Sequence, residues 1–378
     1  MTRPLGSVTV VELGGIGPAP YAGMVLADMG ARVIKVERVD AAAELIPAPR
    51  ETEIMERGKE SIGLDLKSDD GREIVLRLAA EADAFIEGFR PGVTERLGVG
   101  PDDVRAVNPQ ITYGRITGWG QEGPLSGTAG HDIDYIAVGG VLGAIGGEDP
   151  AVPLNLIGDF GGGGMFLACG VLAGVLGARS TGEGTVIDAA MVDGVAHLSS
   201  MMHGGMAAGW WAPRRRSNLL DGGAPFYGVY RTSDDQHMAV GALEPKFFGE
   251  FVDLIGIDPE WKDRQQDVSS WGEMRAEIAD RFSRETREHW TGVFAGSDAC
   301  VAPVMSMAEA TQHPHARARG TFVEVDGVIQ PAPAPRFEGA DRSVPKPRRR
   351  AADTGDILSE LGYSTAHVER LRSQGVVA

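Results

Sequence analysis

A histidine and an aspartate are the residues of this sequence best suited to proton transfer. His131 lies in the segment AGHDIDY, at the start of an apolar stretch, IDYIAVGGVLGAIG, that we predict to be a helix. An imidazole at a helix start can exchange a proton near neutral pH, and the backbone N–H groups beside it favour an oxyanion. The alternative is structural, because Asp132 has the residue type of a helix cap.

Asp159 precedes four consecutive glycines and an uncharged stretch from Met165 to Ala178 that we predict to be a helix. Four glycines exceed what a helix cap requires, so they predict that another backbone or a ligand lies close. A carboxylate beside an apolar helix is partly desolvated, which raises its pKa and suits it to proton transfer. Simple capping of the helix by Asp159 is the structural alternative.

Basic residues lie near the ends of several predicted strands: Arg38, Arg57, Lys59, Lys67 and Arg90. The carboxyl ends of parallel strands collect at one edge of a sheet, where ligands bind. In a chain with a formal net charge of −17, basic residues at successive sheet edges predict a site for a polyphosphate ligand. For any single one of them, solvated surface is the alternative.

Alternating strands and helices must position these residues. We predict strands at residues 8–13, 31–38, 61–66, 84–89 and 110–117, with amphipathic helices between them. The repeated strand–helix–strand pattern predicts a doubly wound α/β domain with a parallel sheet.

The turn GGIGPAP after the first predicted strand has two of the glycines of a dinucleotide-binding fingerprint. Pro20 occupies the position of the third glycine, and Pro18 lacks the N–H group that would face a phosphate. We therefore interpret the segment as a tight structural turn.

The pattern changes after Asp188. We predict one long apolar helix at 189–211, a β-hairpin around 233–236, and further helices up to about residue 295. The Pro- and Arg-rich stretch from Gln330 predicts an extended linker, and a final helix closes the chain.

Composition excludes several classes of function. The net charge of −17 disfavours nucleic acid and anionic membranes as partners. Two cysteines cannot form a disulfide framework, and no cluster with metal-ligand spacing is visible. We found neither a signal peptide nor an apolar run of the ~18 residues that span a membrane, so we predict a cytoplasmic protein.

Ten segments, in order, resemble the α-methylacyl-CoA racemases of the class III CoA-transferase superfamily, most closely actinobacterial members. The segments are VVELGGIGPAPYAGMVLADMGARVIKVER, LDLK, EGFRPGVTERLG, TGWGQEGP, AGHDIDY, NLIGDFGGGGMF, DAAMVDG, DGGAPFY, ALEPKFF and PAPRF. The resemblance implies an enzyme of fatty acid metabolism that racemises 2-methylacyl-CoA thioesters through an enolate. Coenzyme A is part of the substrate, and no further cofactor or metal is implied.

The resemblance also implies an interlocked homodimer with a Rossmann-like large domain and a smaller α+β domain. The large domain would take residues 1–189, completed by 335–378. Residues 190–225 would form a linker helix and connector, 226–320 the small domain, and 321–334 a return linker.

By resemblance, His131 and Asp159 are the two catalytic acid/bases, and Glu244 pairs with the histidine. The helix that opens at Asp132 would supply N–H groups to the enolate oxygen. The family motif GHDINY has asparagine where this chain has Asp134, which replaces an amide donor by an acceptor. The residues expected to bind CoA and its thioester are Arg38, Leu64, Asp65, Leu66, Lys67, Arg90, Gly130, His131, Asp132, Ile133, Asp134 and Tyr135.

Two other functions remain open. A class III CoA-transferase would use Asp159 as a nucleophile on the thioester, but it would not need His131. A non-catalytic acyl-CoA binding protein would need neither acid/base residue. The sequence does not select the acyl group among branched fatty acyl, bile-acid and aryl-propionyl thioesters.

Overall fold

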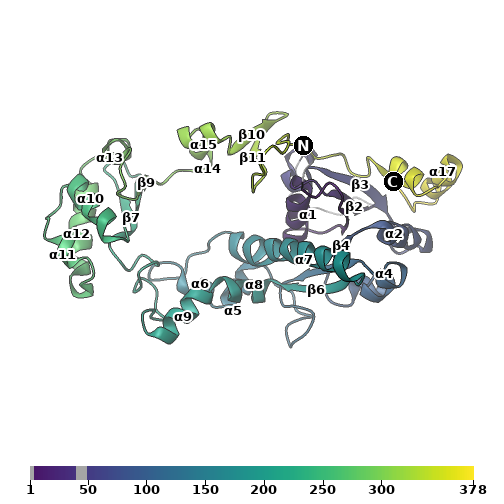
Figure 1. Ribbon diagram of the computed structural model, residues 1–378, viewed down its shortest axis with the longest axis horizontal. Helices are drawn as coiled ribbons and strands as arrows, with labels where there is room; N and C mark the ends of the chain where they lie inside the picture. Colours follow the sequence, from purple (N-terminus) through teal and green to yellow (C-terminus); the bar gives the residue numbers. More distant parts are fainter. Residues whose placement is uncertain (1–3, 40–48) are drawn as a thin grey trace. The chain divides into compact units, whose positions relative to one another are not determined.

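Strands and helices alternate along the first half of the chain in the computed structural model, which describes residues 4–39 and 49–378 (Figure 1). The chain divides into two compact units. The first comprises Met1–Gly139, Leu154–Leu198 and Pro314–Ala378, and the second comprises Gly140–Pro153 and Ser199–His313.

A six-stranded parallel sheet forms the centre of the first unit, with strand order β3-β2-β1-β4-β5-β6. The strands are β1 (Thr9–Leu13), β2 (Arg32–Arg38), β3 (Lys59–Leu64), β4 (Ala84–Glu87), β5 (Thr112–Thr117) and β6 (Thr185–Ala190). The chain runs outward from β1 to β3 and then outward again from β4 to β6. This order confirms the predicted doubly wound α/β fold.

Helices cover both faces of this sheet. One face packs against α2 (Asp69–Glu81), α4 (Pro101–Val107), α16 (Thr354–Glu360) and α17 (Thr365–Ser373). The other face packs against α1 (Pro18–Asp28) and α7 (Met165–Thr181). Short helical turns complete the strand connections: η1 (Arg50–Thr52), η2 (Ile54–Glu56) and α3 (Val93–Arg96).

Helix α7 continues directly from a π-helix, η3 (Leu156–Gly164). The combined helix Leu156–Thr181 has 26 residues and is long and apolar enough to cross a membrane, by length and composition only. The expectation that no segment meets this criterion was therefore wrong. Packing on the sheet accounts for part of this apolar composition, because one face of α7 is buried there: Leu167, Ala168, Val171, Val175 and Ala178.

The single long helix predicted after Asp188 is also wrong. Residues Ala189 and Ala190 belong to β6, which pairs with β5 along its length. The helical part is broken into α8 (Met191–Leu198) and α9 (Ser200–Ala208), because Ser199 leaves helical geometry at ψ 10°. Apolar periodicity alone did not reveal this break.

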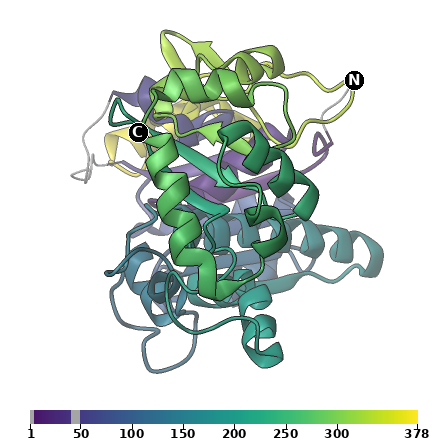
Figure 2. The same ribbon diagram turned by 90° about the vertical axis from the view of Figure 1, so that its left-hand side faces the viewer.

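The second unit contains a three-stranded antiparallel sheet of β7 (Tyr227–Arg231), β8 (His237–Gly241) and β9 (Val301–Pro303). The predicted hairpin is confirmed, because β7 and β8 pair around a turn at 232–236. Its helices are α6 (Val141–Ala144), α9, α10 (Pro245–Ile255), α11 (Trp261–Arg264), η4 (Val268–Ser270), α12 (Trp271–Phe282), α13 (Arg287–Phe294) and α14 (Met307–Ala310). Figure 2 turns the helical side of this unit toward the viewer.

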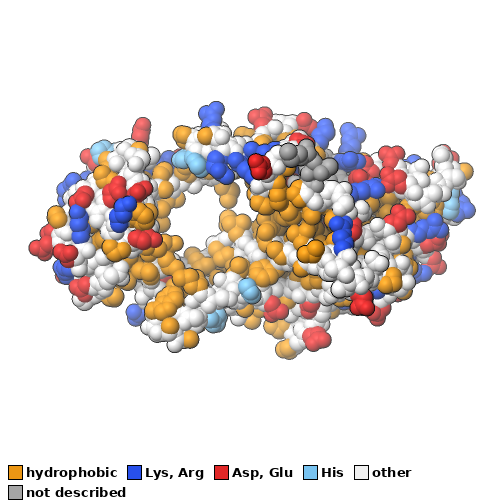
Figure 3. All heavy atoms as spheres, in the orientation of Figure 1, with side chains coloured by type: hydrophobic (Ala, Val, Ile, Leu, Met, Phe, Trp, Pro, Cys, Tyr) orange, Lys and Arg blue, Asp and Glu red, His pale blue; other side chains and the backbone are white. Residues whose placement is uncertain are grey.

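Hydrophobic side chains gather on the surface over α9 (Figure 3), where Met201 and Met206 are exposed.

The chain then returns to the first unit. Residues 321–334 are the return linker that the resemblance implies. They contain a hairpin of β10 (Phe322–Val325) and β11 (Val328–Pro331), which follows α15 (Pro314–Arg319). The extreme C-terminus pairs with the end of β3, where the N–H of Asp65 donates to the carbonyl of Val376 at 2.9 Å.

Two basic residues expected at a polyphosphate site, Arg57 and Lys59, are buried, each with 2% of its surface exposed. Lys59 Nζ lies 2.8 Å from a carboxylate oxygen of Glu12 and 3.5 Å from one of Glu56. Arg57 Nη2 lies 2.5 Å from a carboxylate oxygen of Asp28. That expectation was wrong for these two residues, because buried acidic partners hold both cations inside the unit.

Glycines allow η3 to contact α8 at backbone distance. A Cβ added at Gly194 on α8 would lie 2.6 Å from the carbonyl carbon of Gly162 and 2.7 Å from its Cα. A Cβ added at Gly162 would lie 2.9 Å from the amide nitrogen of Val195. The close approach predicted from the four-glycine run is therefore present, and its partner is another helix.

This contact predicts that Gly194→Ala destabilises the protein by about 1–3 kcal/mol, because a packed backbone must move to admit the methyl group. Urea unfolding followed by circular dichroism measures the change. Gly177→Ala on α7 is the matched control, since no atom lies within 4 Å of its added Cβ. That variant is expected to be neutral or stabilising by up to about 1 kcal/mol. Equal midpoints for the two variants would contradict the predicted close contact.

Candidate active site

Asp159 lies beside the loop after β1, at the point where the strand order of the sheet reverses. This point lies between β1 and β4, and in open α/β sheets it is the usual place for ligands. Only Gly14–Gly17 of the GGIGPAP segment form the connection after β1, because α1 begins at Pro18, so the predicted turn is shorter than expected. Gly17 adopts φ 73°, and a Cβ added to it would lie 3.6 Å from Asp159 Oδ2. The loop after β1 therefore lies against the Asp159 carboxylate.

Asp159 lies in the first turn of η3 and is half-buried. Its Oδ2 accepts a hydrogen bond from Asn155 Nδ2 at 3.0 Å, and its backbone N–H donates to Asp132 Oδ2 at 2.6 Å. Burial raises the pKa of the Asp159 carboxyl, and the negative charge of Asp132 adds to this effect. The Asn155 hydrogen bond and the nearby His131 lower that pKa but do not reverse its direction. The sequence-based prediction of a raised pKa is confirmed.

His131 is exposed and occupies the N-cap position of α5 (Asp132–Val138). Its backbone N–H donates to Asp134 Oδ2 at 2.9 Å, and its carbonyl accepts from the N–H of Asp134, also at 2.9 Å. The structural alternative, in which Asp132 caps this helix, does not apply, because His131 is at the N-cap position. Residue 134 serves as an acceptor, which either aspartate or the asparagine of the family motif can be.

Tyr135 holds the loop before α5. Its hydroxyl donates to the carbonyl of Gly130, and its ring contacts Trp119 edge-on at 4.9 Å between ring centroids. Burial raises the pKa of Tyr135 to about 12, with a further rise from Asp159, and Arg90 opposes this rise. Tyr135 therefore stays neutral and structural, and Arg90 lies close enough to α5 to act on it.

The other residues expected to bind CoA differ in exposure. Arg38 and Lys67 are exposed; Arg38 is the last residue of β2, and Lys67 follows the neighbouring strand β3. Leu64 is buried in the core, and Leu66 packs against it. Asp65 Oδ1 accepts a hydrogen bond from the N–H of Lys67 at 3.0 Å. Any contact of Leu64 with a ligand would therefore involve its backbone.

Glu244 lies in the second unit, where it is exposed at the N-cap of α10. Its negative charge contributes, after burial, to the raised pKa of Cys300. The pairing of Glu244 with His131 remains a prediction. Ile133 is exposed on α5 beside His131.

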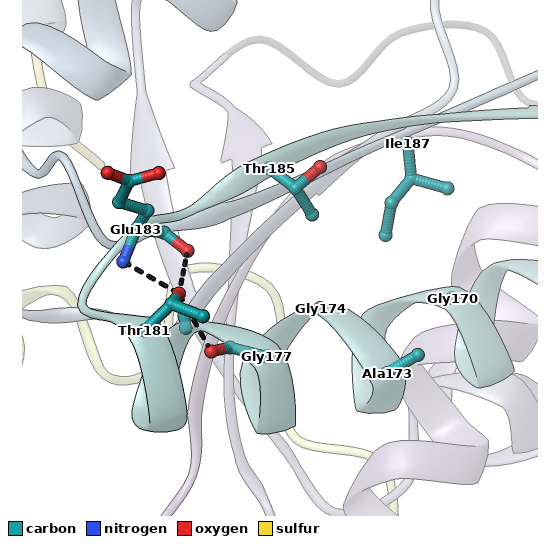
Figure 4. A pocket seen from close by; sticks show the side chains of 9 residues that line it. Gly170, Ala173, Gly174, Gly177, Thr181, Glu183, Thr185 and Ile187 are labelled. Atoms are coloured by element: carbon teal, nitrogen blue, oxygen red, sulfur yellow. Dashed lines mark hydrogen bonds between the residues drawn. The ribbon is translucent and has the colours of Figure 1, made fainter.

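A surface hollow lies between α7 and β6. Its lining includes Gly170, Gly174 and Gly177 of α7 and Thr185 and Ile187 of β6 (Figure 4). Its lining comes from α7, β6 and the turn that joins them. None of the predicted acid/base residues is in this lining, so the hollow and the predicted site are separate. Within residues 4–39 and 49–378, no group of three or more His, Cys, Asp or Glu side chains could hold a metal ion.

Sequence reasoning missed two contacts of Asp159. Asn155 precedes it by four residues, a spacing that places two side chains on one helical face, so its role could have been found. The bond from Asp159 to Asp132 spans 27 positions and could not have been found from local spacing.

Comparison with known proteins agrees with this geometry. The profile of CoA-transferase family III matches residues 5–352. The α-methylacyl-CoA racemase of Mus musculus is 41% identical over 379 residues, which cover 99% of this chain and 97% of that protein. The acetyl-CoA:oxalate CoA-transferase of Acetobacter aceti is 29% identical over 91% of this chain and 92% of its own length. A solved structure of a CAIB/BAIF family protein from Brucella suis matches with a TM-score of 0.80 at 26% identity, and covers 96% of this chain and 100% of that one. The chain therefore belongs to CoA-transferase family III.

Proposed function

We propose that this protein is an α-methylacyl-CoA racemase, an isomerase that interconverts (2R)- and (2S)-2-methylacyl-CoA thioesters. The observation that carries the proposal is the nearness of two side chains able to carry a proton, the imidazole of His131 and the half-buried carboxyl of Asp159. His131 lies near enough to Asp159 to act electrostatically on its carboxyl. The 41% identical relative from Mus musculus has the name of this activity.

The reaction needs only two proton transfers. One residue removes the proton from Cα, and the C–H electron pair moves toward the carbonyl to give an enolate. The other residue returns a proton to the opposite face of Cα, which inverts the configuration without gain or loss of atoms. We propose that His131 and Asp159 exchange the roles of base and acid with the direction of reaction.

The remaining groups of the site stabilise charge. The enolate oxygen requires hydrogen-bond donors, and we propose that the first turn of α5, from Asp132, supplies them. Glu244 would pair with the imidazolium form of His131. The CoA phosphates would meet the exposed cations Arg38, Lys67 and Arg90. Because coenzyme A is part of the substrate, the proposed chemistry requires no further cofactor.

Three further proposals concern surroundings and assembly. The net charge of −17 supports a protein that binds neither nucleic acid nor anionic membranes. We propose a homodimer, as the family resemblance implies, and the cytoplasmic location remains a prediction from the sequence. The acyl group stays open among branched fatty acyl, bile-acid and aryl-propionyl thioesters.

Deuterium exchange at Cα in heavy water, without an acceptor acid, tests the proposed reaction. The wild-type protein is expected to exchange the α-proton and lose chirality in both directions. His131→Ala is expected to slow racemisation about 10²–10⁴-fold but to keep residual exchange with retention in one enantiomer, because Asp159 still serves its own face. Asp159→Ala is expected to show the opposite preference.

The alternatives give different results in the same assay. A CoA-transferase would show no Cα exchange in this assay and would move CoA only after an acceptor acid is added, and a binding protein would do neither. Equal loss of exchange for both enantiomers in both alanine variants would exclude the two-base scheme.

CoA affinity is expected to depend on Arg38. Arg38→Ala removes a charge-assisted contact, so the Kd for CoA should rise about ten- to hundredfold in calorimetry. Arg77→Ala removes an exposed arginine on α2 that pairs with Glu73 and is the matched control. Equal Kd values for both variants would place the nucleotide elsewhere.

The homodimer is expected to persist at nanomolar concentration, because an interlocked dimer cannot separate without opening its chains. Sedimentation velocity across a dilution series measures this. A folded and active monomer would contradict the proposal.

A further inference from the structure

Asp132 is a buried carboxylate that does not cap its own helix. Only 6% of its surface is exposed, although it is the first residue of α5. Its Oδ2 accepts the backbone N–H of Asp159 at 2.6 Å. Its Oδ1 is buried and has no hydrogen-bond partner within the described residues. A buried carboxylate with an unpartnered oxygen costs stability, so a role beyond capping would account for it.

The hydrogen bond acts on the backbone of Asp159 and leaves its carboxyl available. It fixes the first turn of η3 against α5, while the Asp159 side chain is oriented separately by Asn155. The fit is tight, because a Cβ added at Gly158 would lie 2.6 Å from Asp132 Oδ2. The residue before Asp159 therefore has to be glycine for this bond to form.

The same carboxylate acts on Asp159 through its charge. Burial is the main reason for the raised pKa of Asp159, and Asp132 adds to it, against the opposing effects of Asn155 and His131. A nearby negative charge favours the protonated form of a carboxyl. Several other titratable groups lie on the elements that pack around η3. They are Tyr21 and Asp28 on α1, Asp134 and Tyr135 on α5, Cys169 and Arg179 on α7, Asp193 and His197 on α8, Tyr113 and Arg115 on β5, and Asp188 on β6.

We propose that Asp132 is a positioning residue that holds Asp159 by its backbone and keeps the Asp159 carboxyl able to carry a proton in both directions of the reaction. This inference rests on the proposed racemase function. A residue that must act as base in one direction and acid in the other needs both protonation states accessible near the working pH. A half-buried carboxyl beside a second, fixed negative charge meets that requirement better than a solvated one.

Asp132→Asn tests the charge separately from the hydrogen bond, because the amide oxygen can still accept the N–H of Asp159. Removing the negative charge should lower the pKa of Asp159. In the direction in which Asp159 is the base, the acid limb of the kcat profile should move to lower pH. In the direction in which it is the acid, the basic limb should also move to lower pH, and the rate above neutral pH should fall. The KM for the acyl-CoA should change less than kcat, because the backbone N–H groups of α5 that we propose for the thioester oxygen are kept in this variant.

Two further variants keep the test decisive. Asp193→Asn removes an exposed carboxylate from α8, a helix that also packs against η3, but the charge of Asp193 is not among those that act on the Asp159 carboxyl, so this variant should leave both limbs where they are in the wild type. Gly158→Ala keeps the charge of Asp132 but displaces its carboxylate, and should lower kcat about 10–100-fold at the optimum pH.

The outcomes separate this inference from the proposed function. A wild-type protein without Cα exchange would overturn the racemase proposal itself. A racemising wild type whose kcat and pH limbs are unchanged in folded Asp132→Asn would overturn the role of Asp132 alone. If that variant does not fold, unchanged kcat in Gly158→Ala would overturn it instead.

Discussion

The glycines of η3, which have no side chain, are the constraint on which the candidate site depends. Gly162 lets the backbone of α8 approach within contact distance, and Gly158 makes room for the carboxylate of Asp132 on α5. Gly164 meets α1, where an added Cβ would lie 2.9 Å from the carbonyl oxygen of Pro18. Three helices can therefore surround one segment, and Asp159 lies within it. A longer side chain at any of these positions would move the carboxylate away from the loop after β1.

This crowding also determines the electrostatics of Asp159. The close helices leave the Asp159 carboxyl half-buried, and this burial raises its pKa. The polar contacts that hold it in place use its backbone N–H and one carboxylate oxygen. A group fixed in this way can exchange a proton without reorganisation of its surroundings, which is the physical advantage of a preorganised site.

Local sequence patterns predicted the features that depend on neighbours in the chain. The alternation of strands and helices, the hairpin between β7 and β8, and the close approach at the glycine run were all predicted correctly. The break at Ser199 was not, because the apolar pattern continues through it. The burial of Arg57 and Lys59 was missed because their partners, Asp28 and Glu12, are separated from them by 29 and 47 positions. The same limit hid the bond between Asp132 and Asp159. His131 and Asp159 themselves were recognised from residue type and from the family resemblance, and their roles remain proposals.

The distribution of the cations indicates how an acidic protein could bind an anionic substrate. Lys59, Arg57 and Lys35 are buried with acidic partners, Lys35 beside Glu56, so these positive charges stabilise the packing of β2 and β3. Arg38, Lys67 and Arg90 are exposed: Arg38 is the last residue of β2, and Lys67 and Arg90 follow β3 and β4. Since neighbouring parallel strands end at one edge of the sheet, these three cations share the edge that carries Asp159 and the loop after β1. Their local positive charge can attract CoA phosphates even though the net charge of the chain is −17, because salt screens the distant acidic surface within about 10 Å.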